Sequence, residues 1–367
     1  MEFFPLLEEL HIEKCPKLVT IPGHLFCIQN IEIRKKRYSF SSKKIGNGLT
    51  STIVVDSHST NVSTLILHLL EASSKSLRSL GIADLKELCY LPKQLLNLAS
   101  LEHLTVSGCP KLMYIGEEET GAEFNSCLTS LQVLSIDKFS QLRCLPKGLL
   151  QPTLVRLQIT GCSNLTEAGP NELRNLTSLR DLELKRCNSQ WERCWEEGQF
   201  CLNSLQTLVV GYFSEELDYL PWPEVEMAKA QNLQHYPFMF LESLTLWGWR
   251  KLKCLPDQLR HLNSLRKLEI WNFGGLEALP EWLSNFSYLE SLILNRCSNL
   301  TRLPSLENFQ LLKNLQSLDI FECPLLAKRC KEGGEEWHKI AHITIHHRIA
   351  HIPTRLIRGN FSNFSFL

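Results

Sequence analysis

The stretch LEHLTVSGCPKLMYI, from Leu101 to Ile115, decides the fold, because a close copy of it, LEELHIEKCPKLVTI, runs from Leu7 to Ile21. The two copies lie 94 residues apart (101 − 7). Leucines, one cysteine and a final isoleucine recur at the same places, while the polar residues between them change. Repetition of this kind is the sequence signature of repeat architectures, in which every unit is one short structural element.

The pattern LxxLxLxxC, with an aromatic residue sometimes in place of the cysteine, recurs along the chain. We take its second leucine as the centre of a strand. The centres are Leu10, Ile31, Leu80, Leu104, Leu134, Leu157, Leu182, Leu208, Leu244, Leu268, Leu292 and Leu318. Most lie 23–26 residues apart, and the interval of 49 between Ile31 and Leu80 predicts a further strand around Ile53 and Val55, in TSTIVVDS. The spacing therefore indicates about 12–13 units.

The alternation within one unit explains its residues. In LRDLELKRC, Leu182 and Leu184 fall on one face of a short strand, and Asp181, Glu183 and Lys185 fall on the other. One strand cannot bury its leucines alone, but units stacked side by side can. The sequence therefore predicts an α/β leucine-rich-repeat solenoid. We expect a curved horseshoe with a parallel β-sheet on its concave face and a convex side that is mostly irregular or short-helical.

We expect the array to cover residues 1–343, with an irregular segment at 36–76 and an insertion at 217–239. Residues 344–367 do not follow the repeat and are expected to form a tail that is either disordered or the product of altered splicing.

Prolines and cysteines keep fixed places in the units. A proline twelve residues after the strand centre suits the convex return, where no N–H is needed for a ladder. These prolines are Pro22, Pro92, Pro146, Pro256, Pro280 and Pro304.

Cysteines five residues after the centre are Cys15, Cys109, Cys162, Cys187, Cys297 and Cys323, and Phe139, Phe213, Trp249 and Phe273 take the same place elsewhere. A place that accepts cysteine or an aromatic ring is a packing position, so we expect these thiols in the core. Free thiols in this number favour a reducing compartment.

Composition and charge exclude several classes of protein. The chain is 44% hydrophobic and carries 39 basic and 39 acidic residues, so it folds but has no net field to attract nucleic acid. Met1 is followed by EFFPLLEE, which lacks the basic leader of a secretory signal, and we expect no membrane span.

We expect no catalysis, metal or cofactor. No H-E-x-x-H pattern, G-x-S-x-G elbow or phosphate-binding G-x-x-x-x-G-K-[ST] loop occurs. His338, His342 and His346 are spaced four apart, which would place them on one face of a helix as a metal site. The segment IAHITI between them alternates like a strand, and we favour a strand that covers the edge of the last repeat.

The terminal run CPLLAKRCKEGGEEWHKIAHI (Cys323 to Ile343), together with the C-P-x-L strand endings and the LP closures, resembles plant intracellular nucleotide-binding leucine-rich-repeat disease-resistance proteins of the coiled-coil class. The likeness covers roughly residues 1 to 343. It implies recognition of pathogen effectors or guarded host proteins, restraint of a nucleotide-binding switch, and a cytoplasmic or nucleo-cytoplasmic location. The nucleotide-binding module of that family has no counterpart here, so we expect a C-terminal fragment or truncated product that binds no nucleotide, whose partners are proteins.

Partner-binding residues are expected at outward strand positions, the third after each centre. The residues of this aromatic stripe are Trp247, Trp271, Asn295 and Phe321, with Tyr212 one position over in the preceding unit. Equivalent positions in stacked strands lie about 5 Å apart, which would join them into one contact surface. An alternative stays open, in which the insertion 217–239, with Trp222 and Tyr236, folds over them as local packing. A second surface would comprise Arg156, Asp181, Glu183 and Lys185, although mixed charge on a strand face is usually solvation alone.

Two other functions are also considered. Seven N-x-[ST] sequons would suit an extracellular leucine-rich-repeat receptor ectodomain, but the LxGxIP motif of such receptors is missing. A substrate adaptor of a ubiquitin ligase would present a target on the same kind of solenoid, but no F-box-like segment precedes the repeats.

Overall fold

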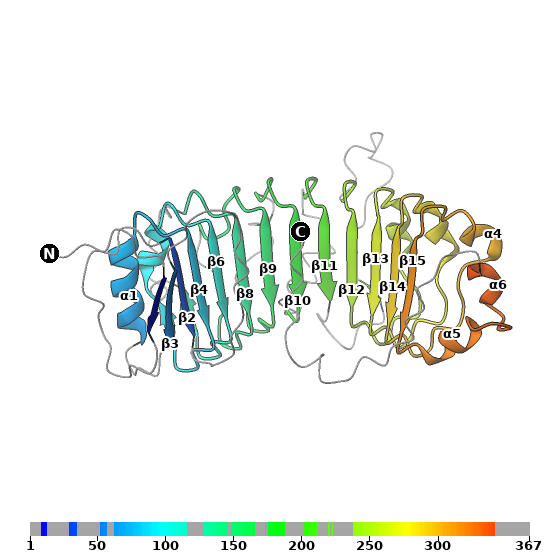
Figure 1. Ribbon diagram of the computed structural model, residues 1–367, viewed down its shortest axis with the longest axis horizontal. Coiled ribbons are helices and arrows are strands. Elements are labelled where there is room, and N and C mark those ends of the chain that lie inside the picture. The colour runs from blue at the N-terminus through cyan, green and yellow to red at the C-terminus, as the bar shows by residue number, and fades with distance from the viewer. Residues whose placement is uncertain are drawn as a thin grey trace. The chain divides into compact units, whose positions relative to one another are not determined.

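The computed structural model describes residues 9–12, 29–34, 52–56, 62–115, 128–145, 148–165, 173, 175–187, 202–211, 219–220, 222 and 238–341 (Figure 1). For residues 9–12, 34, 52–56 and 62 the description is of the backbone alone. The chain divides into two compact units. Unit 1 comprises Met1–Ser214 and Pro221–Phe240, and unit 2 comprises Glu215–Leu220 and Leu241–Leu367. Each is a stack of leucine-rich repeats, as the sequence predicts.

Unit 1 contains nine parallel strands within its described residues, in the spatial order β1-β3-β2-β4-β6-β8-β9-β10-β11. Their bounds are β1 (Glu9–Ile12), β2 (Asn30–Arg34), β3 (Thr52–Asp56), β4 (Ser79–Ala83), β6 (His103–Ser107), β8 (Val133–Asp137), β9 (Arg156–Thr160), β10 (Asp181–Lys185) and β11 (Thr207–Gly211). Every predicted strand centre in this unit lies in one of them. Two short strands, β5 (Tyr90–Leu91) and β7 (Tyr114–Ile115), pair separately on the return side.

The irregular segment 36–76 departs from the expected arrangement in two ways. Strand β3 confirms the strand predicted around Ile53, but it lies between β1 and β2, so chain order and spatial order differ there. The 12-residue helix α1 (Val62–Ser73) is longer than the short helical segments expected, although the other described helices are short. Its buried Leu65, Ile66, Leu69 and Leu70 follow the helical period, which prevails over the repeat period in this segment.

Unit 2 contains four parallel strands among its described residues, ordered β12 (Ser243–Trp247), β13 (Lys267–Trp271), β14 (Ser291–Asn295) and β15 (Ser317–Phe321). Its return segments are short, as predicted: η3 (Asp257–His261), η4 (Glu281–Asn285) and α4 (Leu306–Phe309). Pro256 and Pro280, with φ of −68° and −72°, begin η3 and η4, and Pro92 begins η1 (Lys93–Asn97) of unit 1 in the same way. Proline therefore starts these return turns, where its fixed φ is already suitable.

The strands of unit 2 are stacked without any slip. Leu244, Leu268, Leu292 and Leu318 are partners in successive ladders, and each is at most 1% exposed. Because side chains alternate along a strand, this register brings equivalent outward residues side by side as well.

The cysteine place is confirmed as a core position wherever the structure describes it. Cys109, Cys162, Cys187, Cys297 and Cys323 are buried, as are Phe139, Trp249 and Phe273. The thiols also act as weak donors: Cys187 Sγ lies 3.6 Å from the carbonyl oxygen of Lys185 and 3.5 Å from that of Ile159. A buried thiol thus fills space and partly satisfies carbonyl groups where the strands end.

A left-handed residue follows each strand of the main sheet whose next residue is described, and it keeps the strand ends aligned. The residue four positions after the centre has positive φ, for example 62° at Asn272 and 55° at Arg296. Its N–H donates to the last strand residue of the next repeat, 2.9 Å from Arg296 N to the carbonyl oxygen of Phe321. The ladder therefore continues one residue beyond the strand, and the outward residues at the strand ends stay in line.

The closing run of the chain forms α5 (Pro324–Arg329) and α6 (Trp337–Ile340), which Figure 1 shows together with α4 beyond β15. Ile340 ends a helix, so the strand predicted over IAHITI is wrong at its start. His338 lies in α6, whereas His342, His346 and the tail 344–367 lie outside the described residues. None of the described helices is long and apolar enough to cross a bilayer.

Candidate functional site

The outward face of the unit 2 strands carries three rows of side chains, one residue from each strand per row. The rows are Ser243, Lys267, Ser291 and Ser317; then Thr245, Glu269, Ile293 and Asp319; then Trp247, Trp271, Asn295 and Phe321. The third row is the predicted aromatic stripe, so the structure brings its four described members onto neighbouring strands. Tyr212, the fifth predicted member, lies outside the described residues.

The two tryptophans of this row stack on each other. The ring centroids of Trp247 and Trp271 are 4.5 Å apart and their planes differ by 15°. Both side chains are half-buried. Offset stacking of this kind adds about 0.5–1.5 kcal/mol to the burial of the two rings, so the pair presents a preorganised apolar surface.

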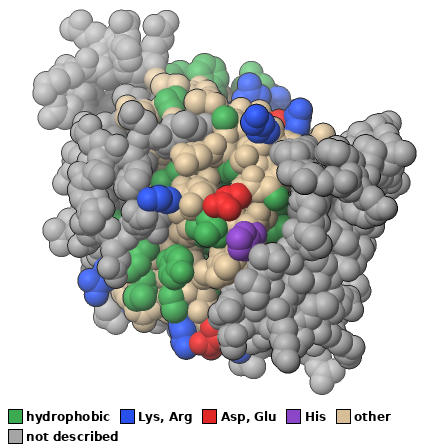
Figure 2. All heavy atoms as spheres, turned by 90° about the vertical axis from the view of Figure 1, so that its left-hand side faces the viewer, with side chains coloured by type: hydrophobic (Ala, Val, Ile, Leu, Met, Phe, Trp, Pro, Cys, Tyr) green, Lys and Arg blue, Asp and Glu red, His purple; other side chains and the backbone are tan. Residues whose placement is uncertain are grey.

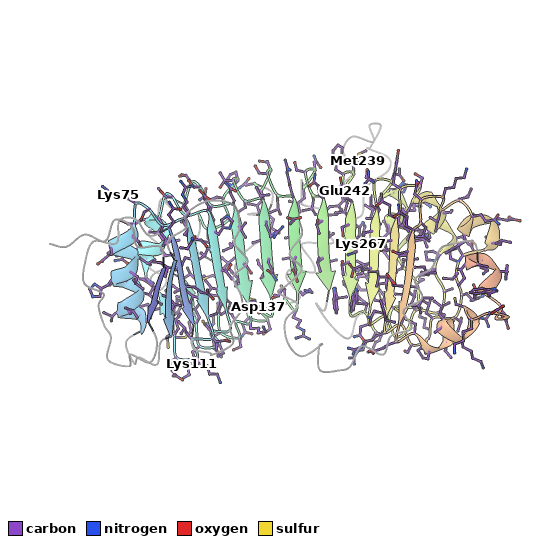
Figure 3. The ribbon with its side chains drawn as sticks, in the orientation of Figure 1. Lys75, Lys111, Asp137, Met239, Glu242 and Lys267 are labelled. Carbon is purple, nitrogen blue, oxygen red and sulfur yellow. The ribbon has the colours of Figure 1, made fainter. Side chains whose placement is uncertain are left out.

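A charged pair on the same strand orients one of the rings. The indole Nε1–H of Trp271 donates to Glu269 Oε2 at 2.7 Å, and Lys267 Nζ lies 2.7 Å from the other carboxylate oxygen. All three side chains belong to β13 and point to one face, and Figure 3 labels Lys267 on that strand. Sequence reasoning missed Glu269 and Lys267. Their places two and four residues before Trp271, on the same face, are the signal that could have found them.

The other two members of the row differ in exposure. Phe321 on β15 is half-buried, whereas Asn295 on β14 is only 4% exposed. Asn295 therefore forms the floor between Trp271 and Phe321 rather than a contact that stands out from the sheet.

Few residues of the insertion 217–239 are described, so the structure tests little of the alternative in which this insertion covers the aromatic stripe. Trp222 and Phe238 from this segment are both buried, and their ring centroids lie 5.5 Å apart. Their rings contact each other. Tyr236 lies outside the described residues, so the alternative stays a prediction.

The second predicted surface lies on β9 and β10 of unit 1 and is internally paired. Arg156 Nη2 lies 2.9 Å from Asp181 Oδ2, and Lys185 forms an ion pair with Glu183. Exposed or half-exposed pairs of this kind contribute little to stability, about 0–1 kcal/mol. The charges of these four residues already pair with one another within the face. A partner protein would therefore gain less from contacting them than from contacting the aromatic row.

Two further pairs of polar side chains lie on the outward face of unit 1. Ser135 Oγ lies 2.9 Å from Gln158 Oε1, and Thr160 donates to Asp137 at the end of β8, where Figure 3 labels the aspartate. Burial lowers the pKa of His103 on β6; Glu102 opposes this shift and Arg156 adds to it. Within the described residues, no cluster of histidine, cysteine or carboxylate side chains has the arrangement of a metal site.

The N-terminal end of unit 1 shows the same mixture of charges. Figure 2 looks onto this end, and on its described surface the basic and acidic side chains lie singly or in mixed groups. Mixed charge of this kind is typical of a solvated surface. A polyanion would need a patch of basic side chains, and the described surface of this end shows none.

A protein-family model described as R13L1/DRL21 LRRs matches residues 253–323, about one fifth of the chain. The matched range includes β13, β14 and β15, and with them Trp271, Asn295 and Phe321. No curated protein matches the chain.

Solved leucine-rich-repeat structures resemble the chain only distantly. The leucine-rich-repeat domain of the type III effector XopL is 21% identical, covers 70% of this chain and 72% of its own, and has a TM-score of 0.39. The ectodomain of the Arabidopsis thaliana receptor kinase GASSHO1/SCHENGEN3, solved with CASPARIAN STRIP INTEGRITY FACTOR 2, is 16% identical, covers 81% of this chain and 38% of its own, and has a TM-score of 0.39. The fold assignment rests on the strand register and the buried leucines described above.

Proposed function

We propose that the chain is a protein-recognition module of plant innate immunity, which binds pathogen effectors or guarded host proteins through the aromatic row of unit 2. The observation that carries the proposal is the stacked, half-buried pair Trp247 and Trp271 on the outward face of the strands. Tryptophan is enriched among the residues that dominate protein interfaces, and a rigid ring loses little conformational entropy when it is covered.

Three further points support a binding role. Leucine-rich-repeat domains bind proteins, and the match to R13L1/DRL21 repeats falls on the strands that carry the row. The terminal run Cys323 to Ile343 resembles the closing segment of plant nucleotide-binding resistance proteins. In that family the repeats also contact the nucleotide-binding domain, so we include this domain among the proposed partners and place the protein in the cytoplasm, without a cofactor or enzymatic activity of its own.

Binding assays with both indoles of the row removed test the proposal. The full chain is immobilised and screened against a panel of secreted effector proteins from plant pathogens. Each true anchor contributes about 2 kcal/mol or more, so the double variant Trp247→Ala/Trp271→Ala should lose at least about thirtyfold in affinity.

A matched control is available in unit 2. Trp282 of η4 is also half-buried, and its Nε1 lies 2.9 Å from Asp257 Oδ1 on the return side of the repeat. Trp282→Ala removes an indole without touching the aromatic row and should keep full affinity. Equal affinity of the wild type and the double variant for every bound effector would exclude the row as the binding site.

A further inference from the structure

Two cysteines of neighbouring repeats lie side by side near the C-terminal end of unit 2. Cys297 follows β14 and Cys323 follows β15, each five residues after its strand centre. The strand ends are held in register up to this point, because Arg296 N donates to the carbonyl oxygen of Phe321. Neighbouring strands lie about 4.7–4.9 Å apart, and a disulfide needs Cα atoms about 4.4–6.8 Å apart. The backbone spacing at this pair therefore suits a disulfide.

The side chains of the pair also approach each other. The backbone N–H of Cys297 donates to Cys323 Sγ at 3.3 Å, and the two thiols are hydrogen-bonded to each other. Cys323 Sγ lies 3.6 Å from the carbonyl oxygen of Leu294, so it leans over the preceding repeat. Both cysteines are free thiols. The two sulfur atoms thus already share one space between the last two strands.

The contact makes the two thiols chemically unequal. The hydrogen bond from the Cys297 thiol lowers the pKa of Cys323; burial opposes this shift, and the Cys297 N–H adds to it. The same thiol–thiol hydrogen bond, together with burial, raises the pKa of Cys297. Because the thiolate is the nucleophile, Cys323 carries the reactive sulfur. Cys297 lies beside it as a resolving thiol.

We propose that Cys297 and Cys323 form a modification site, which hydrogen peroxide oxidises to a disulfide within the chain. The Cys323 thiolate attacks one peroxide oxygen, the O–O bond breaks, and hydroxide leaves with the proton that Cys323 had lost, as water. Cys323 is then a sulfenic acid. The Cys297 sulfur attacks the Cys323 sulfur, the S–O bond breaks, and the hydroxyl group leaves with the Cys297 proton as a second water. The two thiols lose two electrons, and the peroxide gains them. This site does not depend on the proposed function.

The position of Cys323 selects a small oxidant. Cys323 is 2% exposed, but both of its chain neighbours, Glu322 and Pro324, are exposed, so it lies directly beneath the surface where α5 begins. A molecule the size of hydrogen peroxide reaches this sulfur through a small local opening, whereas glutathione disulfide is too large to do so. In a reducing compartment such a disulfide is transient, because cellular thiols reduce it again.

Unit 1 contains a matched pair that lacks the reactive thiolate. Cys162 and Cys187 take the same place in the neighbouring repeats of β9 and β10. Their thiols donate to backbone carbonyl groups, Cys162 to Thr160 and Cys187 to Ile159. Burial raises the pKa of both. The same backbone spacing without a stabilised thiolate makes this pair the internal control.

Mass spectrometry of the oxidised full chain tests the site. The protein is treated with graded hydrogen peroxide, its remaining thiols are blocked with iodoacetamide in urea, and its peptides are analysed without reduction. We expect a cross-link between Cys297 and Cys323 that dithiothreitol reverses. Its yield should exceed that of a link between Cys162 and Cys187 by about tenfold or more, since each unit of pKa changes the thiolate population about tenfold.

A variant separates the two steps. Cys297→Ser keeps the size of the side chain but removes the resolving sulfur, so Cys323 should accumulate as a sulfenic acid that dimedone traps after urea is added. The wild type alone can overturn the inference. It fails if Cys297 and Cys323 stay reduced at peroxide concentrations that oxidise the exposed Cys254. It also fails if the link forms only after urea has unfolded the chain, or if both cysteine pairs cross-link equally.

Discussion

The indole rings of Trp247 and Trp271 lie 4.5 Å apart although 24 residues (271 − 247) separate them in the chain. The contact exists because the two residues are direct partners in the ladder between β12 and β13. Residues one repeat apart in the chain therefore come within stacking distance. The aromatic row depends on the core that holds the strands in register.

The stack itself should be measurable as a coupling energy. Replacing Trp247 and Trp271 by leucine, singly and together, gives a double-mutant cycle whose interaction term should be about 0.5–1.5 kcal/mol in favour of the pair. Urea unfolding followed by circular dichroism provides the four free energies. Strict additivity of the two single changes would show that the rings do not interact in solution.

A charge placed in the core should disrupt unit 1. Leu182 is 1% exposed and lies between its ladder partners Leu157 and Leu208. Leu182→Arg buries an unpaired guanidinium and should lower the free energy of unfolding by about 3 kcal/mol or more, which a denaturant titration detects.

Thr207 supplies the control for that substitution. It is half-buried on the outward face of the adjacent strand β11, where it is the ladder partner of Asp181. Thr207→Arg should leave the transition nearly unchanged, because its charge stays at the surface beside a carboxylate. Equal unfolding curves for Leu182→Arg and the wild type would refute an inward-facing Leu182.

The core cysteines should resist alkylation in the native protein. Burial raises the pKa of Cys109 to about 11 and that of Cys162 to about 12, so almost no thiolate is present at neutral pH. Cys254 is an exposed thiol in unit 2 and serves as the internal reference. Iodoacetamide treatment followed by peptide mass spectrometry should label Cys254 and spare Cys109 and Cys162 until urea is added. Labelling of all three at similar rates would contradict a core role.

The C-terminal end of unit 2 should depend on one buried ion pair. Glu336 is 3% exposed, accepts from the Leu303 N–H at 3.0 Å and lies 2.7 Å from Lys339 Nζ. Glu336→Ala leaves Lys339 largely buried without its acidic partner, although its bond to the Leu303 carbonyl remains, and should destabilise this end by about 3 kcal/mol. Hydrogen exchange at the Leu303 amide reports the change directly.

The neighbouring Glu335 separates this effect from a general loss of acidic charge. Its side chain is 74% exposed, and its ion pair with Arg329 lies at the surface. Glu335→Ala should therefore leave exchange at Leu303 as in the wild type. Loss of protection at Leu303 in both variants would point to charge rather than the buried pair.

Much of the architecture could be predicted from the sequence, because it depends on residue positions within a single repeat unit. The inward leucines, the cysteine place and the return prolines each follow from a position within one unit, and burial at Leu268 or Cys297 repeats what the pattern requires. The predicted aromatic row on unit 2 has the same origin, since alternation alone assigns Trp271 to the outward face.

Features that depend on contacts between residues far apart in the chain could not be predicted from the repeat pattern. The placement of β3 between β1 and β2 is a choice among strands with equivalent edges, and α1 forms where a helical period competes with the repeat. At the site, sequence alone determined that Trp247, Trp271, Asn295 and Phe321 lie in one row. Only the tertiary structure decided that Glu269 fixes one indole and that Asn295 is nearly buried, because burial and hydrogen bonding depend on which side chains the neighbouring strands supply.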